Sequence, residues 1–263
     1  MKPAPFDYAR PADWPAALAL LAEGARPVAG GQSLGPMLNL RLALPERVAD
    51  LRHLPDYAGV AVQGDVVRIG AGTTHAAIED GAVPGRLGEI LAGVARRIAY
   101  RPVRNRGTIG GSFAHADPAA DWCAVLPVLP GHAIALGPEG ERRIPLAAFV
   151  LGVFETALRA DELLRAVEVP VLPGAARFGH WKFCRKPGEF SKATACVLAL
   201  PGAAPVAVLA ALDTAPLVIP DASALLADPA AEAARLVAGL GLDDPWRAAL
   251  ARKALRHAAE ATR

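Results

Sequence analysis

The chain has 263 residues, a formal net charge of +2 and 21% charged residues, which argues against a nucleic-acid binder, because such proteins usually carry a basic stripe. Its hydrophobic fraction of 53% is enough for a sizeable core, and its length fits two or three packed subdomains. The longest uncharged stretch, 193–212, is interrupted by prolines and a glycine at 201–205, so two buried strands explain it better than a membrane span. The N-terminus lacks the apolar core of a signal peptide, and a cytoplasmic protein is expected.

Residues 1–54 predict a first, small α/β unit. Asp13 is placed to cap a helix that begins at Trp14. A short strand over 26–29 then ends at a glycine pair, and 48–51 predicts another short element. Helix, strand and glycine turn in this order are typical of an α/β subdomain.

Residues 55–173 predict a second α+β unit. A hairpin is expected over 60–72 because a tight Gly-Asp turn separates two apolar runs. Thr74 is a candidate N-cap for a short helix, and the apolar spacing over 87–98 predicts a longer one. Further strands are expected over 134–136, 142–146 and 163–169.

Residues 174–263 predict a third unit. The strand pair within 193–212 comes first, and a helical stretch is expected over 222–240. A last helix is expected over 245–259, where leucines and alanines supply the apolar positions.

Two glycine-rich segments carry the strongest functional signal: AGGQSL at 29–34 and TIGGS at 108–112. Adjacent glycines let the backbone approach a ligand closely and adopt positive φ, so successive N–H groups can converge on phosphate oxygens. Two such loops could hold a diphosphate from both sides. A glycine pair alone is also common in ordinary turns, and neither segment matches the Rossmann or P-loop pattern.

Together, AGGQSL at 29–34 and NRGTIGGS at 105–112 resemble the FAD-binding subunit of the xanthine dehydrogenase and carbon monoxide dehydrogenase family of molybdenum hydroxylases. The segments HADPAAD at 115–121 and WKFCRKPGEF at 181–190 are also similar to that family. The resemblance implies an α+β chain: a two-subdomain FAD-binding domain of the vanillyl-alcohol-oxidase-like (PCMH-type) fold in 1–54 and 55–173, followed by a C-terminal α+β domain with a small antiparallel sheet in 174–263.

The same resemblance implies which residues bind FAD. It assigns the diphosphate to the two loops, at Val28, Ala29, Gly30, Gly31, Gln32, Ser33 and Leu34 and at Thr108, Ile109, Gly110, Gly111 and Ser112. It assigns Asp121 to the adenosine ribose and Leu164 to a contact with adenine. Ile98 and Lys182 would lie near the isoalloxazine, where a cation can tune the reduction potential.

Several of these assignments have simpler alternatives. Asp121 could cap a helix, Ile98 could be ordinary helix core, and Lys182 could be a solvated strand lysine. Some family members carry a tyrosine two residues before this lysine, where this chain has His180. Either His180 or Trp181 would face the ring, because successive strand side chains point to opposite faces.

Two further expectations concern the loops. A side chain introduced at Gly31 or Gly110 is expected to fill the space of a cofactor phosphate.

Arg101, Arg104 and Arg106 form the densest basic cluster, which is either a solvated loop that favours cofactor phosphates or a docking surface for an acidic partner.

The function that the resemblance implies is electron transfer, with no catalytic residue and no metal ligand in this chain. A molybdenum-cofactor large subunit would hydroxylate the substrate, and electrons would pass through the [2Fe–2S] clusters of a small subunit to FAD. FAD would then pass them to NAD⁺, a quinone, oxygen or another acceptor. The assembly would be a heterotrimer or a dimer of heterotrimers. The three cysteines, Cys123, Cys184 and Cys196, form no cluster-ligand pattern.

Two other functions are open on the sequence. One is a self-sufficient FAD oxidase of the same wider fold, for which His115 is the nearest candidate for a covalent flavin link. The C-terminal segment is short for the substrate domain of such an enzyme. The other is a scaffold subunit that has lost FAD, against which the two intact glycine loops argue.

Overall fold

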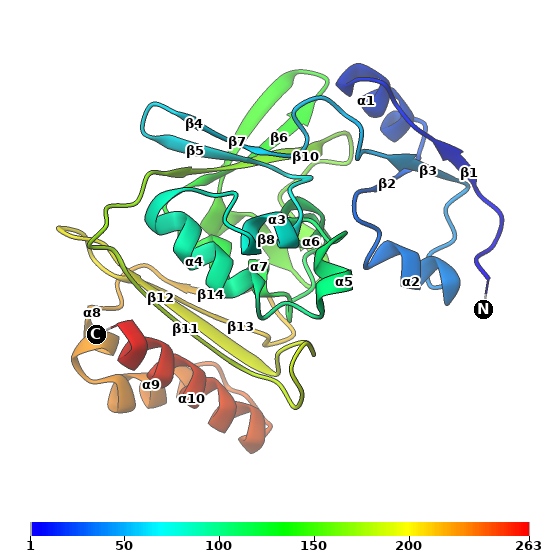
Figure 1. Cartoon of the computed structure of the whole chain (residues 1–263). Helices are drawn as coiled ribbons and strands as arrows, with labels where there is room; N and C mark the ends of the chain where they lie inside the picture. The colour runs from blue at the N-terminus through cyan, green and yellow to red at the C-terminus, as the bar shows by residue number, and fades with distance from the viewer. Residues whose placement is uncertain (1, 263) are drawn as a thin grey trace.

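The computed structural model describes residues 2–262, and its first sheet consists of three parallel strands. The central strand β3 (Arg47–Asp50) pairs with both β1 (Asp7–Ala9) and β2 (Arg26–Val28). Two helices accompany it, α1 (Trp14–Ala22) and α2 (Leu34–Asn39). The N-terminal part of the chain is therefore α/β in character (Figure 1, blue).

Local signals explain where α1 begins. The Asp13 side chain accepts a hydrogen bond of 2.8 Å from the N–H of Ala16, which confirms the predicted N-cap. Trp14 and Ala17 are buried on the inner side of the helix. The indole N–H of Trp14 donates to the carbonyl of Pro55 at 2.9 Å, and this bond ties α1 to the next part of the chain.

The second sheet is antiparallel, with strand order β4-β5-β10-β6-β7. Its strands are β4 (Val60–Gln63), β5 (Val66–Gly70), β6 (His132–Gly137), β7 (Gly140–Pro145) and β10 (Leu163–Pro170). The hairpin and the three later strands predicted from the sequence are confirmed. A short hairpin of β8 (Val150–Gly152) and β9 (Glu155–Thr156) lies outside this sheet.

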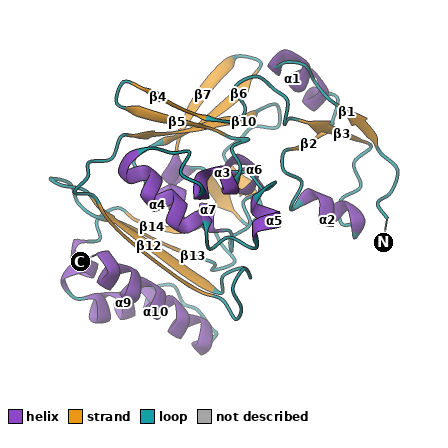
Figure 2. Ribbon diagram, viewed as in Figure 1, coloured by secondary structure: helices purple, strands orange, loops and turns teal. Residues whose placement is uncertain are grey.

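Five helices lie between the second and third sheets (Figures 1 and 2). They are α3 (His75–Glu79), α4 (Gly85–Ala95), α5 (Arg101–Arg104), α6 (Ile109–His115) and α7 (Asp121–Val125). Thr74 caps α3 by accepting from the N–H of Ala77 at 3.1 Å, as predicted. The helix expected over 87–98 starts and stops earlier, because Pro84 precedes its first turn and the chain reverses at Ala99, whose φ is 42°.

The third sheet is antiparallel and confirms the small C-terminal sheet. Its strands, in order, are β11 (Arg177–Phe183), β12 (Ala193–Ala199), β13 (Val206–Ala210) and β14 (Leu217–Ile219). Helix α10 (Pro245–Thr262) packs on its outer face, and α8 (Ser223–Ala227) and α9 (Pro229–Ala238) pack against α10 (Figure 1). The helical stretch expected over 222–240 is confirmed and consists of two helices, because Asp228 caps a new helix that begins at Pro229.

The strand β12 is buried on both faces, which explains why its sequence is uncharged. Ala195 and Val197 pack in the core formed with α10, whereas Cys196 and Leu198 pack in the core shared with the five-helix layer. Alternate side chains thus serve two cores. No helix within residues 2–262 is long and apolar enough to cross a membrane.

Candidate cofactor site

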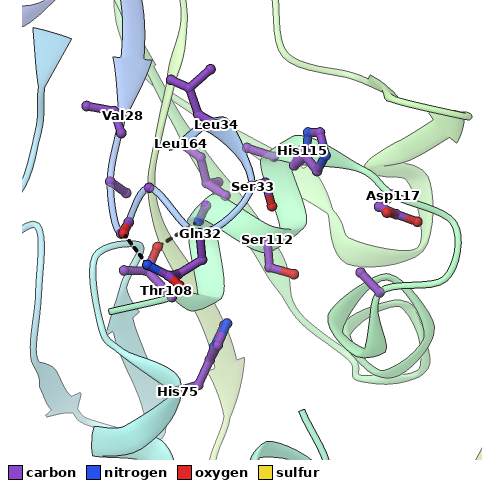
Figure 3. Close-up of a pocket in the computed structure, with 18 of the residues that line it drawn as sticks. Val28, Gln32, Ser33, Leu34, His75, Thr108, Ser112, His115, Asp117 and Leu164 are labelled. Carbon is purple, nitrogen blue, oxygen red and sulfur yellow. Dashed lines mark hydrogen bonds between the residues drawn. The ribbon is translucent and has the colours of Figure 1, made fainter. Parts of the chain in front are cut away.

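A cavity of about 350 Å³ lies where the loop after β2 meets the helical layer. That volume falls in the range of small-molecule sites. Most of the site residues predicted from the sequence line it: residues 28–34, Ile98, Thr108, Gly110, Gly111, Ser112, Asp121 and Leu164. The cavity is not lined by Ile109, His180 or Lys182. Figure 3 shows how segments distant in the sequence converge on it.

The two glycine segments touch each other at one wall of the cavity. A Cβ added to Gly30 would overlap the carbonyl of Arg106, and a Cβ added to Gly111 would lie 3.5 Å from the Cβ of Ala29. Gly31 adopts a φ of +70°, a conformation that glycine takes without steric cost. Glycine at position 30 therefore lets the two backbones pack directly against each other at the cavity wall.

The first glycine segment supplies unpaired backbone donors. Within residues 2–262, no acceptor is found for the N–H groups of Gly30, Gly31, Gln32 and Ser33. The Gln32 amide donates back to the carbonyl of Gly30 at 3.3 Å, which closes the turn. All four residues line the cavity, and successive free N–H groups can converge on anionic oxygens.

The second glycine segment is different, because it is the first turn of α6 rather than a loop. Thr108 caps α6 by accepting from the N–H of Gly111 at 3.0 Å. The N–H groups of Ile109 and Gly110 donate to the carbonyls of Thr73 and Ala71 at 3.0 and 2.9 Å. These donors are engaged within the protein, so α6 offers a cavity ligand its Ser112 hydroxyl rather than a row of backbone N–H groups.

The sequence analysis expected a side chain at Gly110 to fill the space of a cofactor phosphate, and this physical reason is wrong. A Cβ at this position would overlap Ala71, so a side chain there would separate α6 from the end of β5 rather than occupy the space of a phosphate. Gly31 is different, because a Cβ there would meet only the Val28 side chain, at 3.7 Å. For Gly31 the expectation of a clash with phosphate stays a prediction.

Asp121 and Lys182 form a buried ion pair that the sequence analysis did not foresee. The Lys182 ammonium donates to both carboxylate oxygens of Asp121 at 2.9 Å and to the carbonyl of Arg97 at 3.0 Å. Both side chains are buried. Burial raises the pKa of Asp121, and the positive charges of Lys182 and Arg97 oppose that rise. Lys182 is thus a buried partner of a carboxylate at the cavity wall, not a solvated lysine.

Successive side chains of β11 point to opposite faces of the sheet, so His180 and Trp181 lie on different faces. Trp181 packs in the core formed with α10, with its ring 5.4 Å from the ring of His257. His180 lies on the opposite face, the face of Lys182, and contacts the Thr194 hydroxyl at 3.3 Å. Burial lowers the pKa of His180 to about 3. Trp181 therefore faces away from the helical layer, and His180 faces toward it without reaching the cavity.

The arginine cluster is largely neutralised inside the chain. Arg101 pairs with Asp80 and Glu79, and Arg104 pairs with Glu79 at 2.7 Å. Arg106 has no ion pair within the described part of the chain. Most of the positive charge that would attract an acidic partner is therefore already paired. This pairing favours a solvated loop over a docking surface for an acidic partner.

Sequence reasoning missed other residues of the cavity wall. His75 is 4% exposed and lines the cavity beside Thr108 (Figure 3). The segment 188–190 comes from the C-terminal part of the chain and lines the cavity too. The only local signal for His75 was its place after the helix cap Thr74, which marks it as part of a helix start and nothing more.

Comparison with known proteins decides the family. A model of the FAD-binding domain in molybdopterin dehydrogenase matches residues 4–172. The chain belongs to this family. It is 40% identical over 202 residues to the carbon monoxide dehydrogenase medium chain of Afipia carboxidovorans, covering 75% of this chain and 70% of that one. It is also 38% identical over 194 residues to the 6-hydroxypseudooxynicotine dehydrogenase complex subunit alpha of Paenarthrobacter nicotinovorans, covering 73% of this chain and 66% of that one.

The fold agrees with the family. The chain superposes on a chain in the solved structure of reconstituted CO dehydrogenase from Oligotropha carboxidovorans with a TM-score of 0.89, at 32% identity, over 100% of this chain and 99% of that one. The predicted fold class is confirmed, and FAD is the cofactor of this domain. The cavity fits FAD, because unpaired N–H groups on residues 30–33 meet the need of a diphosphate for donors.

Proposed function

We propose that this chain is the FAD-binding medium subunit of a molybdenum hydroxylase and that it relays electrons from the [2Fe–2S] clusters of a partner subunit to an external acceptor. The observation that carries this proposal is the cavity between the two glycine segments, with its unpaired N–H groups on residues 30–33. FAD supplies the redox centre. The chain's own residues bind it, orient it and exclude water from it.

In this proposal the first segment, from Val28 to Leu34, holds the diphosphate through its free N–H groups and the Ser33 hydroxyl. The Ser112 hydroxyl donates from the other side. Backbone donors suit this task, because Arg26 is the one arginine among the described residues of the cavity wall, and that wall contains no lysine. A diphosphate there is neutralised chiefly by N–H dipoles.

Asp121 is proposed to bind the adenosine ribose. Both of its oxygens accept from Lys182, yet an ionised carboxylate has about four lone-pair sites, so ribose hydroxyls can still donate to it. Lys182 then acts on the cofactor through Asp121. Ile98 and Leu164 supply apolar wall for the rings. His180 and Ile109 do not line the cavity, so neither is assigned a direct contact with the cofactor.

The partners are proposed from the relatives. The carbon monoxide dehydrogenase relative is named a medium chain, and the Paenarthrobacter relative is named a subunit of a complex. We infer a large subunit with the molybdenum cofactor and a small subunit with [2Fe–2S] clusters, assembled as a heterotrimer or a dimer of heterotrimers in the cytoplasm. The proposed domain limits are 1–54, 55–173 and 174–263.

The first test is a visible spectrum of the purified chain before and after acid precipitation. Flavin bands that move into the supernatant are expected for a dissociable FAD subunit. Bands that stay with the pellet would instead indicate a covalent flavin, for which His115 is available at the cavity wall. A chain that shows no bands and fails to bind added FAD would support the scaffold function.

The second test concerns the electron route. A tagged chain is purified from its native host, and the molybdenum and iron that accompany it are measured. We expect both metals and two further subunits. We also expect a substrate of the molybdenum subunit to reduce the flavin under anaerobic conditions only while the iron–sulfur subunit is present. A purified chain that carries neither metal and reduces its flavin with a small alcohol would overturn the proposal.

A further inference from the structure

The side chain of His75 carries a feature that the proposed function does not use. It is 4% exposed, and it lines the cavity near the point where the two glycine segments meet. Its own backbone N–H donates to the carbonyl of Gly107 at 2.9 Å. The backbone at His75 is therefore held against the second glycine segment, and its side chain lines the cavity.

A neighbouring tryptophan decides which ring nitrogen carries the proton. The indole Nε1–H of Trp122 donates to Nδ1 of His75 at 3.0 Å, and the indole is fully buried. An indole N–H can only donate, so Nδ1 must be the acceptor and carry no proton. The proton of the neutral imidazole is then on Nε2.

The Nε2–H group finds no acceptor among the residues that the structure describes. No residue within 2–262 accepts a hydrogen bond from it, although the side chain is almost wholly buried. Space beside it is kept open by Gly107, because a Cβ there would lie 2.8 Å from Nε2. Nε2 is not among the fully buried polar atoms that lack a partner, so it keeps accessible surface. The cavity that this side chain lines is where a ligand oxygen can accept its hydrogen bond.

The ring stays neutral at physiological pH. Burial, together with the positive charge of Arg104, lowers the pKa of His75 to about 4. Arg104 is itself paired with Glu79. A neutral imidazole on one fixed tautomer is a directional donor whose strength does not change across neutral pH.

We propose that His75 is a positioning residue for FAD, and that its Nε2–H, held in this tautomer by Trp122, donates a hydrogen bond to an oxygen of the ribityl–diphosphate portion. The location favours this portion, because Gly107 and Arg106 on one side and Gly30 on the other form the contact between the two glycine segments. The proposal adds an imidazole donor to a site whose other proposed donors are the backbone N–H groups of 30–33 and the hydroxyls of Ser33 and Ser112.

The test compares three variants of the full chain for FAD affinity, measured by titration of the FAD-free protein with FAD. His75→Leu keeps the volume and removes the donor, and we expect roughly tenfold weaker binding. His75→Gln places an amide N–H close to the position of Nε2, and we expect it to restore most of the affinity. Trp122→Phe keeps the packing but frees the tautomer, and we expect an intermediate loss.

A second readout separates positioning from a merely structural role. In ¹⁵N spectra of the FAD-free chain, we expect His75 to show an unprotonated Nδ1 and a protonated Nε2, and we expect the Nε2 proton signal to shift when FAD is added. Thermal melting of each FAD-free variant controls for folding. Two results would overturn the proposal: His75→Gln binding FAD as poorly as His75→Leu at equal melting temperature, or an Nε2 proton signal that FAD leaves unchanged.

Discussion

Removing the ammonium of Lys182 should destabilise the chain severely. This side chain belongs to β11 of the C-terminal sheet, and its partner Asp121 begins α7 in the helical layer. The ion pair has side-chain exposures of 2% and 7%. Lys182→Met retains the length of the side chain but leaves the buried carboxylate and the carbonyl of Arg97 without their donor.

The magnitude follows from the cost of a buried unpaired charge. Breaking a buried ion pair by removing one partner typically costs about 3–5 kcal/mol, and we expect a loss of this size in the free energy of unfolding of Lys182→Met. Asp121→Asn should lose less, because the amide still accepts one bond from Lys182. The double variant should be more stable than the sum of the two losses predicts, with a coupling of roughly 1–3 kcal/mol.

The assay is urea unfolding of the full chain, with and without saturating FAD. Lys253→Met is the matched control, because Lys253 is exposed on α10, and an exposed site should change stability by less than about 0.5 kcal/mol. The reasoning is refuted if Lys182→Met is no less stable than this control. Additive losses in the double variant would show that the two side chains do not stabilise each other.

Three shorter predictions concern the cavity wall. Gly110→Val should lower the urea midpoint of the FAD-free chain, because its Cβ would overlap Ala71; a variant that unfolds normally and loses only FAD would contradict this. Thr108→Ala should cost about 1 kcal/mol in the same assay, since the helix cap on α6 is lost. Because His75 has a pKa near 4 when folded and near 6.5 when unfolded, the unfolded chain binds more protons between these values. Stability should therefore fall by roughly 3 kcal/mol as pH drops from 6.5 towards 4, and His75→Gln should remove that part of the pH dependence in unfolding curves.

The sequence predicted features that depend on residues close together in the chain. Asp13 and Thr74 cap their helices as expected because a cap needs a hydrogen bond only to the N–H three residues on. The uncharged run at 193–212 gave two buried strands, since no charged side chain had to be placed on either face. The glycine segments were found because paired glycines followed by polar residues are visible in the sequence itself.

What the sequence did not predict depends on contacts between distant residues. Lys182 and Asp121 are 61 positions apart, and no local pattern joins them. The contact between Gly110 and Ala71 required knowledge of how α6 packs against the end of β5. The resemblance to the family directed attention to TIGGS at 108–112, but it could not show that the backbone donors of this segment are engaged within the protein.

The first two residues of α7 connect the C-terminal sheet to the cavity. Asp121 holds Lys182 on β11, and Trp122 holds the imidazole of His75. Neighbouring helix residues point about 100° apart, so one short helix can satisfy both partners at once. The cavity wall is thereby fixed from two directions: by the glycine segments that surround it, and by the C-terminal sheet, whose β11–β12 connection lines the cavity at 188–190. A domain that contributes few residues to the wall can therefore still set the geometry of its polar groups.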